Sequence, residues 1–146
     1  MIAVDTNILV YAHRPESPLH ERALVTLDEL HAVGSPWGIP VHCLVEFAAV
    51  VSNPRIWRQP SSPSAIADQA AVWQESRGFR LLGDDAVVWS RSCELATRGH
   101  VAGGAWYDAR VAAACLAHGV RELWTADRDY SHFPAVRVRN PLVESG

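Results

Sequence analysis

Four acidic side chains stand at points where the sequence would otherwise continue as an apolar segment. Asp5 ends the run IAV, Asp127 follows ELWTA, Glu46 is the one charged residue of VHCLVEFAAVV, and Asp108 opens the pattern DARVAAACLAHG. Carboxylates that a fold brings together repel one another and bind protons more tightly. Mg²⁺ and Mn²⁺ relieve that repulsion, because these hard cations prefer oxygen ligands and often hold substrate phosphates. If the four acids meet in space, they predict a site for such a cation.

Each acid also has an ordinary structural explanation. Asp5 or Thr6 can cap a helix, and Asp127 can form an Asx-turn with the two residues that follow it. Asp108 lies in the first turn of a predicted helix, where the helix dipole favours an acid by about 0.3–1 kcal/mol. Glu46 is the hardest to explain, because burying a carboxylate in an apolar helix costs several kcal/mol without a compensating cation or donors. The ordinary alternative for Glu46 is an exposed helix edge or a pair with an arginine.

The segments around these acids alternate between predicted strands and predicted helices. Short apolar runs predict strands at 2–4, 36–39, 79–82, 122–125 and 136–138. Helical patterns run from a Ser17 cap to Gly34, over 40–51, from 64 onward, over 86–98 and over 106–118, with turn-rich or flexible connections at 53–63 and 99–104. This alternation indicates an α/β fold with a largely parallel sheet, in which sites form at the carboxyl ends of strands. Asp5 and Asp127 are then expected on the same edge of the sheet.

The composition excludes several classes of protein. All 13 Lys+Arg residues are arginines, which excludes P-loop, Schiff-base and lysine-dependent phosphate chemistry. The three cysteines are scattered and never in CxxC spacing, which indicates reduced thiols in a cytosolic protein. No apolar run approaches the roughly 20 residues that span a bilayer, and no signal peptide is expected.

The formal net charge of −3 looks unfavourable for a protein that binds nucleic acid. If bound metal neutralises four carboxylates, the balance becomes about +1, and RNA is no longer disfavoured.

Four ordered segments resemble the PIN-domain nucleases and, within them, the VapC-type toxins of bacterial toxin–antitoxin pairs. They are VDTNIL, the isolated helical glutamate at 46, YDARVAAACLAHG and LWTADRDYSHFP, and the RVRNPL ending is similar to mycobacterial-type members. The similarity spans nearly the whole chain. It implies a single PIN domain over 1–146, folded as a three-layer α/β/α sandwich around a mostly parallel sheet of four to five short strands.

The same resemblance implies a Mg²⁺- or Mn²⁺-dependent endoribonuclease that hydrolyses phosphodiester bonds in single-stranded RNA. The residues it implicates are the metal-binding acids Asp5, Glu46, Asp108 and Asp127, the supporting residues Thr6 and Asn7, and Asp129, which assists or replaces Asp127. It also implies a cognate VapB-type antitoxin that blocks the acidic groove, a homodimer, and a cytoplasmic location. The apolar helices near 24–30 and 41–51 could supply those contacts or could be core.

Arginines near the motif acids are candidates for contacts to substrate phosphates. Arg14, Arg110 and Arg128 qualify, although surface salt bridges explain them at least as well. The connection around Trp57 could stack an RNA base, but packing of Trp57 beneath the loop is the interpretation we favour. The seven histidines show no HxH or HExxH spacing, and Asp84-Asp85 fits a helix cap better than a catalytic pair.

Three rival interpretations stay open. An aspartate-based phosphatase of the haloacid dehalogenase-like group needs a DxD after the first strand and generally a lysine, whereas here the third position is Asn7. A receiver domain built on Asp84-Asp85 lacks its lysine as well. A catalytically inactive PIN-like module that binds RNA or protein is the third, and the presence of all four acids weakens it.

Overall fold

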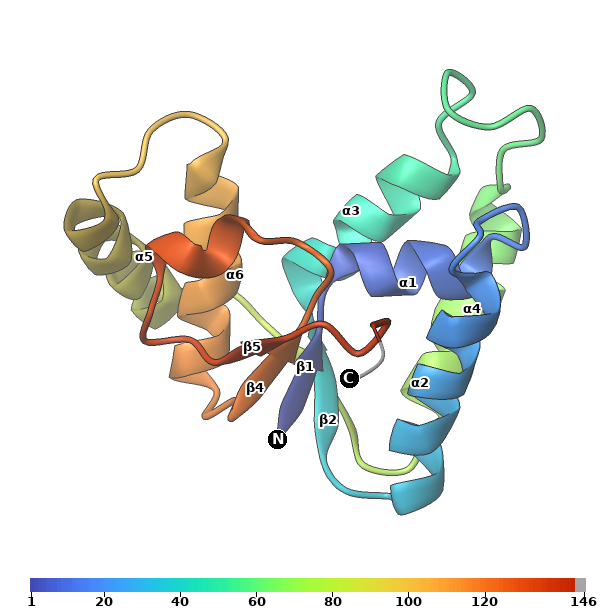
Figure 1. Cartoon of the computed structure of the whole chain (residues 1–146), viewed down its shortest axis with the longest axis horizontal. Helices are drawn as coiled ribbons and strands as arrows, with labels where there is room; N and C mark the ends of the chain where they lie inside the picture. Colours follow the sequence, from blue (N-terminus) through green and yellow to red (C-terminus); the bar gives the residue numbers. More distant parts are fainter. Residues whose placement is uncertain (144–146) are drawn as a thin grey trace.

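Five short strands form one sheet in the computed structural model, which describes residues 1–143 (Figure 1). The strands are β1 (Ile2–Val4), β2 (Trp37–Pro40), β3 (Phe79–Leu82), β4 (Glu122–Trp124) and β5 (Val138–Arg139). They lie in the order β3-β2-β1-β4-β5, and every pairing is parallel. The central strand β1 therefore pairs with β4, and the segments that carry Asp5 and Asp127 leave the same edge of the sheet.

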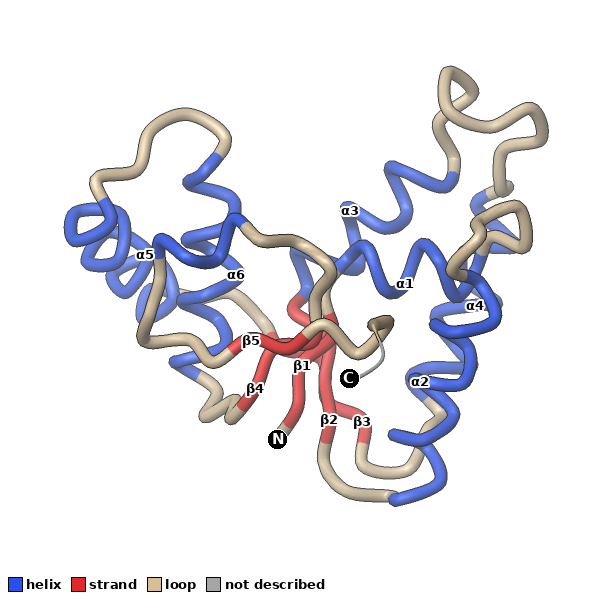
Figure 2. Tube along the Cα trace, viewed as in Figure 1, coloured by secondary structure: helices blue, strands red, loops and turns tan. Residues whose placement is uncertain are grey.

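Helices cover both faces of this sheet (Figures 1 and 2). The α-helices are α1 (Thr6–His13), α2 (His20–Val33), α3 (Val41–Val51), α4 (Pro63–Gln74), α5 (Ala86–Gly99) and α6 (Ala105–Ala117), and the 3₁₀-helix is η1 (Asp129–His132). Figure 1 shows α5 and α6 on one side of the sheet and α1, α2 and α4 on the other. The predicted three-layer α/β/α arrangement around a parallel sheet is confirmed.

Apolar packing explains why the central elements form. Ala3 and Val4 of β1 are fully buried, as expected for a strand with neighbours on both sides and helices on both faces. Ile8 and Leu9 bury the sheet-facing side of α1. The alanines of α6 that the sequence places on one small-residue face are also fully buried, namely Ala109, Ala112 and Ala113. Their small size lets the helix that carries Asp108 approach the core closely.

The boundaries of α2 differ from the prediction at one end only. Ser17 does not cap the helix at Pro18; its hydroxyl accepts a hydrogen bond from the backbone N–H of Leu19, and the helix begins at His20. The local Ser-turn satisfies the donors that a helical first turn would have used. The predicted end is correct, because Gly34 adopts φ +70°, a conformation that glycine tolerates best.

Other boundaries move by one or two residues. β2 extends to Pro40, and α4, α5 and α6 begin or end one residue from their predicted limits. β5 begins at Val138, because Val136 instead turns inward, is buried, and donates its backbone N–H to the Phe133 carbonyl. The 3₁₀-helix η1 was not predicted, since a single tight turn has no 3.6-residue pattern to detect.

Within residues 1–143, none of the helices is both long enough and apolar enough to cross a membrane. The three cysteines are free thiols, with Cys43 and Cys115 buried.

Candidate active site

Asp5 stands at the joint between β1 and α1, and both of its carboxylate oxygens accept hydrogen bonds. Oδ1 accepts from the backbone N–H of Thr6 at 2.8 Å and from the Cys43 thiol at 3.3 Å. Oδ2 accepts from the Thr125 hydroxyl at 2.8 Å. Asp5 is also the N-cap of α1 and is only 5% exposed. One carboxylate therefore caps the helix and is held rigidly at the end of the central strand.

Burial raises the pKa of Asp5, and the hydrogen bonds from Thr125, Thr6 and Cys43 act in the opposite direction, as does the hydroxyl of Tyr130. These donors stabilise the charged form that burial alone would disfavour. Thr6 is itself buried, with its hydroxyl 3.4 Å from the Cys43 carbonyl oxygen, which ties α1 to α3. The charge of Asp5 is thus kept in place by the protein rather than by solvent.

Asn7 and Thr125 connect α1 to the loop that follows β4. The Asn7 amide donates to the Thr125 hydroxyl at 3.1 Å and accepts from the backbone N–H of Ala126 at 3.0 Å. The Thr125 hydroxyl also accepts from the backbone N–H of Asp127 at 3.0 Å. Since Thr125 donates its own proton to Asp5, this single hydroxyl fixes the spacing between Asp5 and Asp127.

Asp127 and Asp129 lie together with Asp108. One carboxylate oxygen from each of these three residues lies within 4.8 Å of the others, which is close enough to hold one metal ion. Asp127 Oδ1 also accepts the backbone N–H of Asp129 at 2.8 Å, so the predicted Asx-turn is present. The turn directs both acids toward the first turn of α6, where Asp108 lies.

The environment of Asp108 favours its protonated form. Partial burial and the negative charges of Asp127, Asp5, Asp129 and Glu46 raise its pKa from 3.8 to about 6. A carboxyl group that shares space with other carboxylates behaves in this way unless a cation neutralises the cluster.

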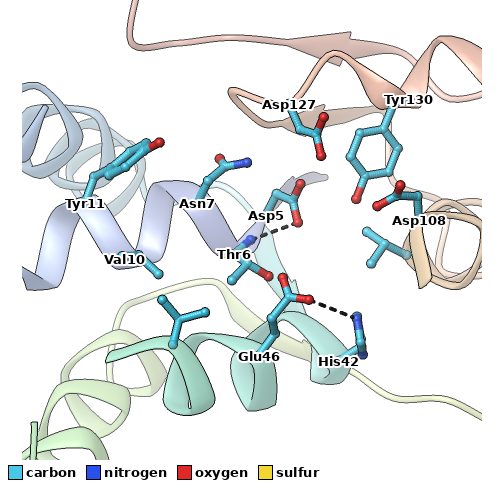
Figure 3. Close-up of a pocket in the computed structure, with 12 residues that line it drawn as sticks. Asp5, Thr6, Asn7, Val10, Tyr11, His42, Glu46, Asp108, Asp127 and Tyr130 are labelled. Carbon is cyan, nitrogen blue, oxygen red and sulfur yellow. Dashed lines mark hydrogen bonds and ion pairs between the residues drawn. The ribbon is translucent and has the colours of Figure 1, made fainter. Parts of the chain in front are cut away.

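The four acids singled out in the sequence line one pocket of about 330 Å³ (Figure 3). Figure 3 shows the side chains of Asp5, Glu46, Asp108 and Asp127 directed toward a common space, each carried by a different segment of the chain. The other polar residues of the pocket are Thr6, Asn7, Tyr11, His42 and Tyr130. Asp129 belongs to the three-acid group but is not among the described residues that line this pocket.

Of the two interpretations of Glu46, the structure shows the exposed helix edge rather than a buried carboxylate, and the residue lines the pocket from that edge. Its side chain is 47% exposed and lies 3.6 Å from the His42 ring. α3 is packed through Cys43 and Phe47, which leaves the Glu46 edge open to solvent. The high cost of burial therefore does not explain why an acid occurs here.

For Arg14 the structure shows the alternative, a salt bridge with Glu16, rather than a guanidinium free to contact substrate phosphate. Its guanidinium is almost fully buried and donates to Glu16, to the Ser61 hydroxyl and to the Gln59 carbonyl. It also lies 4.2 Å from the ring centroid of Trp57, whose indole N–H donates to the Val50 carbonyl. Arg14 therefore links the 53–62 connection to the end of α1. Trp57 packs beneath that connection, which is the interpretation favoured from the sequence.

The other two arginines differ from each other. Arg110 forms an ion pair with Asp84 and faces His42, so its donors already have partners in the protein, and it is not among the described residues that line the pocket. Arg128 is exposed beside Asp127 and has no ion pair among residues 1–143. Asp85 caps α5 through the backbone N–H of Val88, as predicted.

Thr125, Tyr130 and His42 were not predicted as site residues. A hydroxyl that ends the apolar run LWT was the one available signal for Thr125. Tyr130 is 3% exposed, and burial together with the charge of Asp5 raises its pKa. His42 lines the pocket one helical turn before Glu46.

Comparisons with known proteins agree on one family. The family model described as PIN domain matches residues 2–136. Ribonuclease VapC43 of Mycobacterium tuberculosis is 31% identical over 142 residues, covering 97% of this chain and 96% of that protein. Ribonuclease VapC31 of the same species is 28% identical, covering 97% of this chain and 100% of that protein.

Two solved structures share the fold at low sequence identity. VapBC2 from Rickettsia felis, bound to a DNA fragment from its promoter, has a TM-score of 0.70 at 19% identity, over 96% of this chain and 98% of that one. VapC20 of Mycobacterium tuberculosis, a Sarcin-Ricin loop cleaving toxin, has a TM-score of 0.66 at 21% identity, over 90% of this chain and 93% of that one. At these low sequence identities, the similarity shows a shared fold alone.

Proposed function

Because the chain belongs to the PIN-domain family and, within it, to the VapC ribonucleases, we propose that it is a toxin that hydrolyses phosphodiester bonds in single-stranded RNA. The observation that carries the proposal is the meeting of Asp5, Glu46, Asp108 and Asp127 in one pocket. These acids come from positions spread over most of the chain. Structural explanations such as helix capping account for each acid alone but not for their convergence.

The donor set of the pocket fits Mg²⁺ or Mn²⁺. Carboxylate oxygens dominate it, and the three-acid group in residues 1–143 contains neither imidazole nor thiolate. Such a set suits hard cations rather than zinc or copper. Asp5 and Asp108 are the ligands we assign most directly, while Glu46 and Asp127 complete the site, and Asp129 assists or replaces Asp127. A bound ion would lower the pKa of a water molecule and stabilise negative charge on the scissile phosphate.

Hydrogen bonds within the protein keep the acidic side chains in this arrangement before RNA binds. Three donors keep the oxygens of Asp5 at fixed positions, and Thr125 sets the spacing from Asp5 to Asp127. Glu46 lines the pocket and is exposed to solvent, so a backbone phosphate is expected to reach the acids from its side. Arg128 is the arginine best suited to attract that phosphate, because it is exposed next to Asp127.

We propose the remaining properties from the family. The neighbours from Rickettsia felis and Salmonella typhimurium are described as DNA-bound VapBC structures, and a further one as a toxin–antitoxin complex. A cognate VapB-type antitoxin, a homodimer, a cytoplasmic location and a single domain over 1–146 are proposed on this basis. Val25 on α2 and Val45 on α3 are exposed apolar residues that such contacts could cover, whereas Leu27 and Leu30 belong to the core.

The rival functions are less well supported. An aspartyl phosphatase of the haloacid dehalogenase-like group needs a second aspartate two residues after Asp5, where this chain has Asn7, and generally a lysine, which the chain lacks. An inactive binding module would not need four acids in one pocket at the cost of their mutual repulsion.

Cleavage of RNA by purified protein tests the proposal. Asp5→Asn and Asp108→Asn should each lower Mn²⁺-dependent cleavage by at least roughly 100-fold, the scale of losing one group that acts on the transition state. Asparagine is also a good helix cap, so the fold should persist. Asp28→Asn, the same change on an exposed part of α2, is the matched control and should keep full activity.

Full activity in both site variants, or cleavage that survives EDTA, would overturn the proposal. In cells, expression without a cognate antitoxin gene should arrest growth. Mapping the cleavage sites in total RNA after a pulse of wild type, beside Asp5→Asn, then identifies the RNA.

A further inference from the structure

His42 lies in the first turn of α3, one turn before Glu46, and lines the pocket with the four acids (Figure 3). Its side chain is 14% exposed, whereas that of Glu46 is 47% exposed. His42 is not one of the acids assigned to the metal, and the proposed hydrolysis does not use it directly. Its contacts on the far side of the ring indicate what it does.

Arg110 determines which nitrogen of His42 carries the ring proton. Nη1 of Arg110 lies 3.3 Å from Nδ1 of His42. A guanidinium group contains only donors, so the nitrogen that faces it must be an acceptor. The proton of neutral His42 therefore resides on Nε2. Arg110 is in turn held by the Asp84 carboxylate through its Nε atom, which fixes the donor that faces Nδ1.

The other nitrogen of His42 faces Glu46. Nε2 lies 3.6 Å from Oε2 of Glu46, which is longer than a hydrogen bond but close enough for a favourable electrostatic contact. The opposite tautomer would set a lone pair against the carboxylate and an N–H against the guanidinium. Both contacts therefore favour the same tautomer, with the N–H on the side of Glu46.

Tyr107 fixes the plane of the ring. The two rings are stacked with 5.6 Å between their centroids and 7° between their planes. Tyr107 directly precedes Asp108 on α6, so the stack joins the helix that carries Asp108 to the helix that carries Glu46. The imidazole is thus restrained at its face and at both nitrogens.

We propose that His42 is a positioning residue for Glu46, and that Asp84, Arg110 and Tyr107 hold it for that task. Glu46 is an exposed acid on a flexible side chain, so it needs an outside contact to stay directed into the pocket. A carboxylate that is already ordered loses less conformational entropy when a cation binds. The inference rests on the proposed function, because it takes Glu46 to be one of the metal-binding acids.

The tautomer can be read directly from two-bond proton–nitrogen NMR spectra of the metal-free protein at about pH 8. Wild type should show His42 protonated on Nε2 and unprotonated on Nδ1. Arg110→Met should give a mixture of tautomers, because the donor that selects one form is gone. A proton on Nδ1 in wild type, or no change in Arg110→Met, would overturn the inference.

Mn²⁺ affinity of the purified protein, measured by calorimetry, tests the effect on Glu46. His42→Phe keeps a ring that can stack on Tyr107 but removes both nitrogens, and it should weaken Mn²⁺ binding by roughly ten-fold, the scale typical of residues that orient a metal ligand. His42→Gln restores an acceptor and a donor and should recover most of that loss. His31→Gln is the matched control on α2, where the histidine contacts Ser76, and it should bind as wild type.

Two results would contradict the inference: unchanged Mn²⁺ affinity in His42→Phe, or an equal loss in His42→Phe and His42→Gln. The first would show that the ring matters only for packing, and the second that the donor and acceptor of an amide do not replace the ring nitrogens. Failure of the proposed function has a different signature, because wild type would then bind Mn²⁺ and leave RNA intact. In that case the NMR and calorimetric results still decide whether His42 positions Glu46.

Discussion

Replacing Asp108 by asparagine should make the metal-free protein more stable at neutral pH, although the same change removes activity. The pKa of Asp108 is raised from 3.8 to about 6, first by burial and then by the charge of Asp127 and the neighbouring acids. The folded state therefore binds this proton more tightly than the unfolded chain does. The resulting stabilisation is complete below about pH 4 and is lost as the pH rises through about 6. At pH 7 the ionised carboxylate is a destabilising group.

The size of the effect follows from that difference. Each pKa unit corresponds to about 1.4 kcal/mol, so a rise from 3.8 to about 6 corresponds at face value to about 3 kcal/mol. Asp108 is only partly buried, and solvent and salt screen its neighbours, which reduces the expected gain for Asp108→Asn to about 1–2 kcal/mol. For a chain of this size the melting temperature should rise by about 3–6 °C.

Thermal unfolding in EDTA between about pH 4 and pH 8 measures this directly. The gap in melting temperature between Asp108→Asn and wild type should be near zero at the acid end and should grow through about pH 6. Asp28→Asn, on an exposed surface of α2, should show no such trend. Saturating Mn²⁺ should reverse the order, since an ion at about 100 times its Kd adds about 2.7 kcal/mol to wild type.

A gap that does not change with pH would refute the reasoning, as would an asparagine variant that is less stable than wild type at pH 7 in EDTA. Either result would mean that the acids of the pocket do not repel one another in the folded protein. The convergence of charge on which the metal assignment depends would then be absent.

Other substitutions separate the parts of the site. Thr125→Val removes the hydroxyl that donates to Asp5 and accepts from Asn7. The Mn²⁺ affinity measured by calorimetry should therefore fall by roughly 10–100-fold, and an unchanged affinity would contradict the place of Thr125 in the site. Arg14→Met should lower the free energy of unfolding by about 1–3 kcal/mol in urea titrations, because the hydrogen bonds that this buried guanidinium donates to Ser61 and Gln59 are lost, while cleavage per folded molecule stays unchanged. Arg128→Gln should leave the free energy of unfolding unaltered but weaken RNA binding, and it should reduce the salt dependence of that binding by about one ion. RNA affinity equal to that of wild type at low salt would exclude the contact between Arg128 and phosphate.

The acids were predictable because their positions conflict with the local pattern. Asp5 and Asp127 interrupt apolar strands, and parallel strands bring such ends to the same edge of a sheet. The sequence left open whether Glu46 is buried or exposed, since helix periodicity cannot tell an apolar face in the core from an apolar face near solvent. Its exposure depends on how α3 leans against α1, which is a tertiary property.

Closeness along the sequence does not bring Arg14 to the pocket. Asp5 and Arg14 are separated by the whole of α1, and a helix of eight residues carries the chain about 12 Å from its start. The turn after α1 then directs the guanidinium toward the 53–62 connection. Only contacts between residues that are far apart in the sequence reveal where the guanidinium lies.

Uncharged polar residues escaped the sequence analysis for a related reason. A threonine, tyrosine or histidine has so many ordinary uses that its type alone indicates little. Thr125 matters because Asp5 lies opposite it across 120 residues of sequence. His42 matters because Arg110 reaches it from another helix.

The position of β1 between β2 and β4 has a consequence for the time at which the protein becomes active during its synthesis. β1 is the first strand to be translated, yet its neighbour β4 is among the last elements of the chain. The pocket that Asp5 forms with Thr125 and Asp127 can therefore assemble only after nearly all residues have left the ribosome. A nascent chain carries no complete pocket, so the enzyme is silent while it is being made.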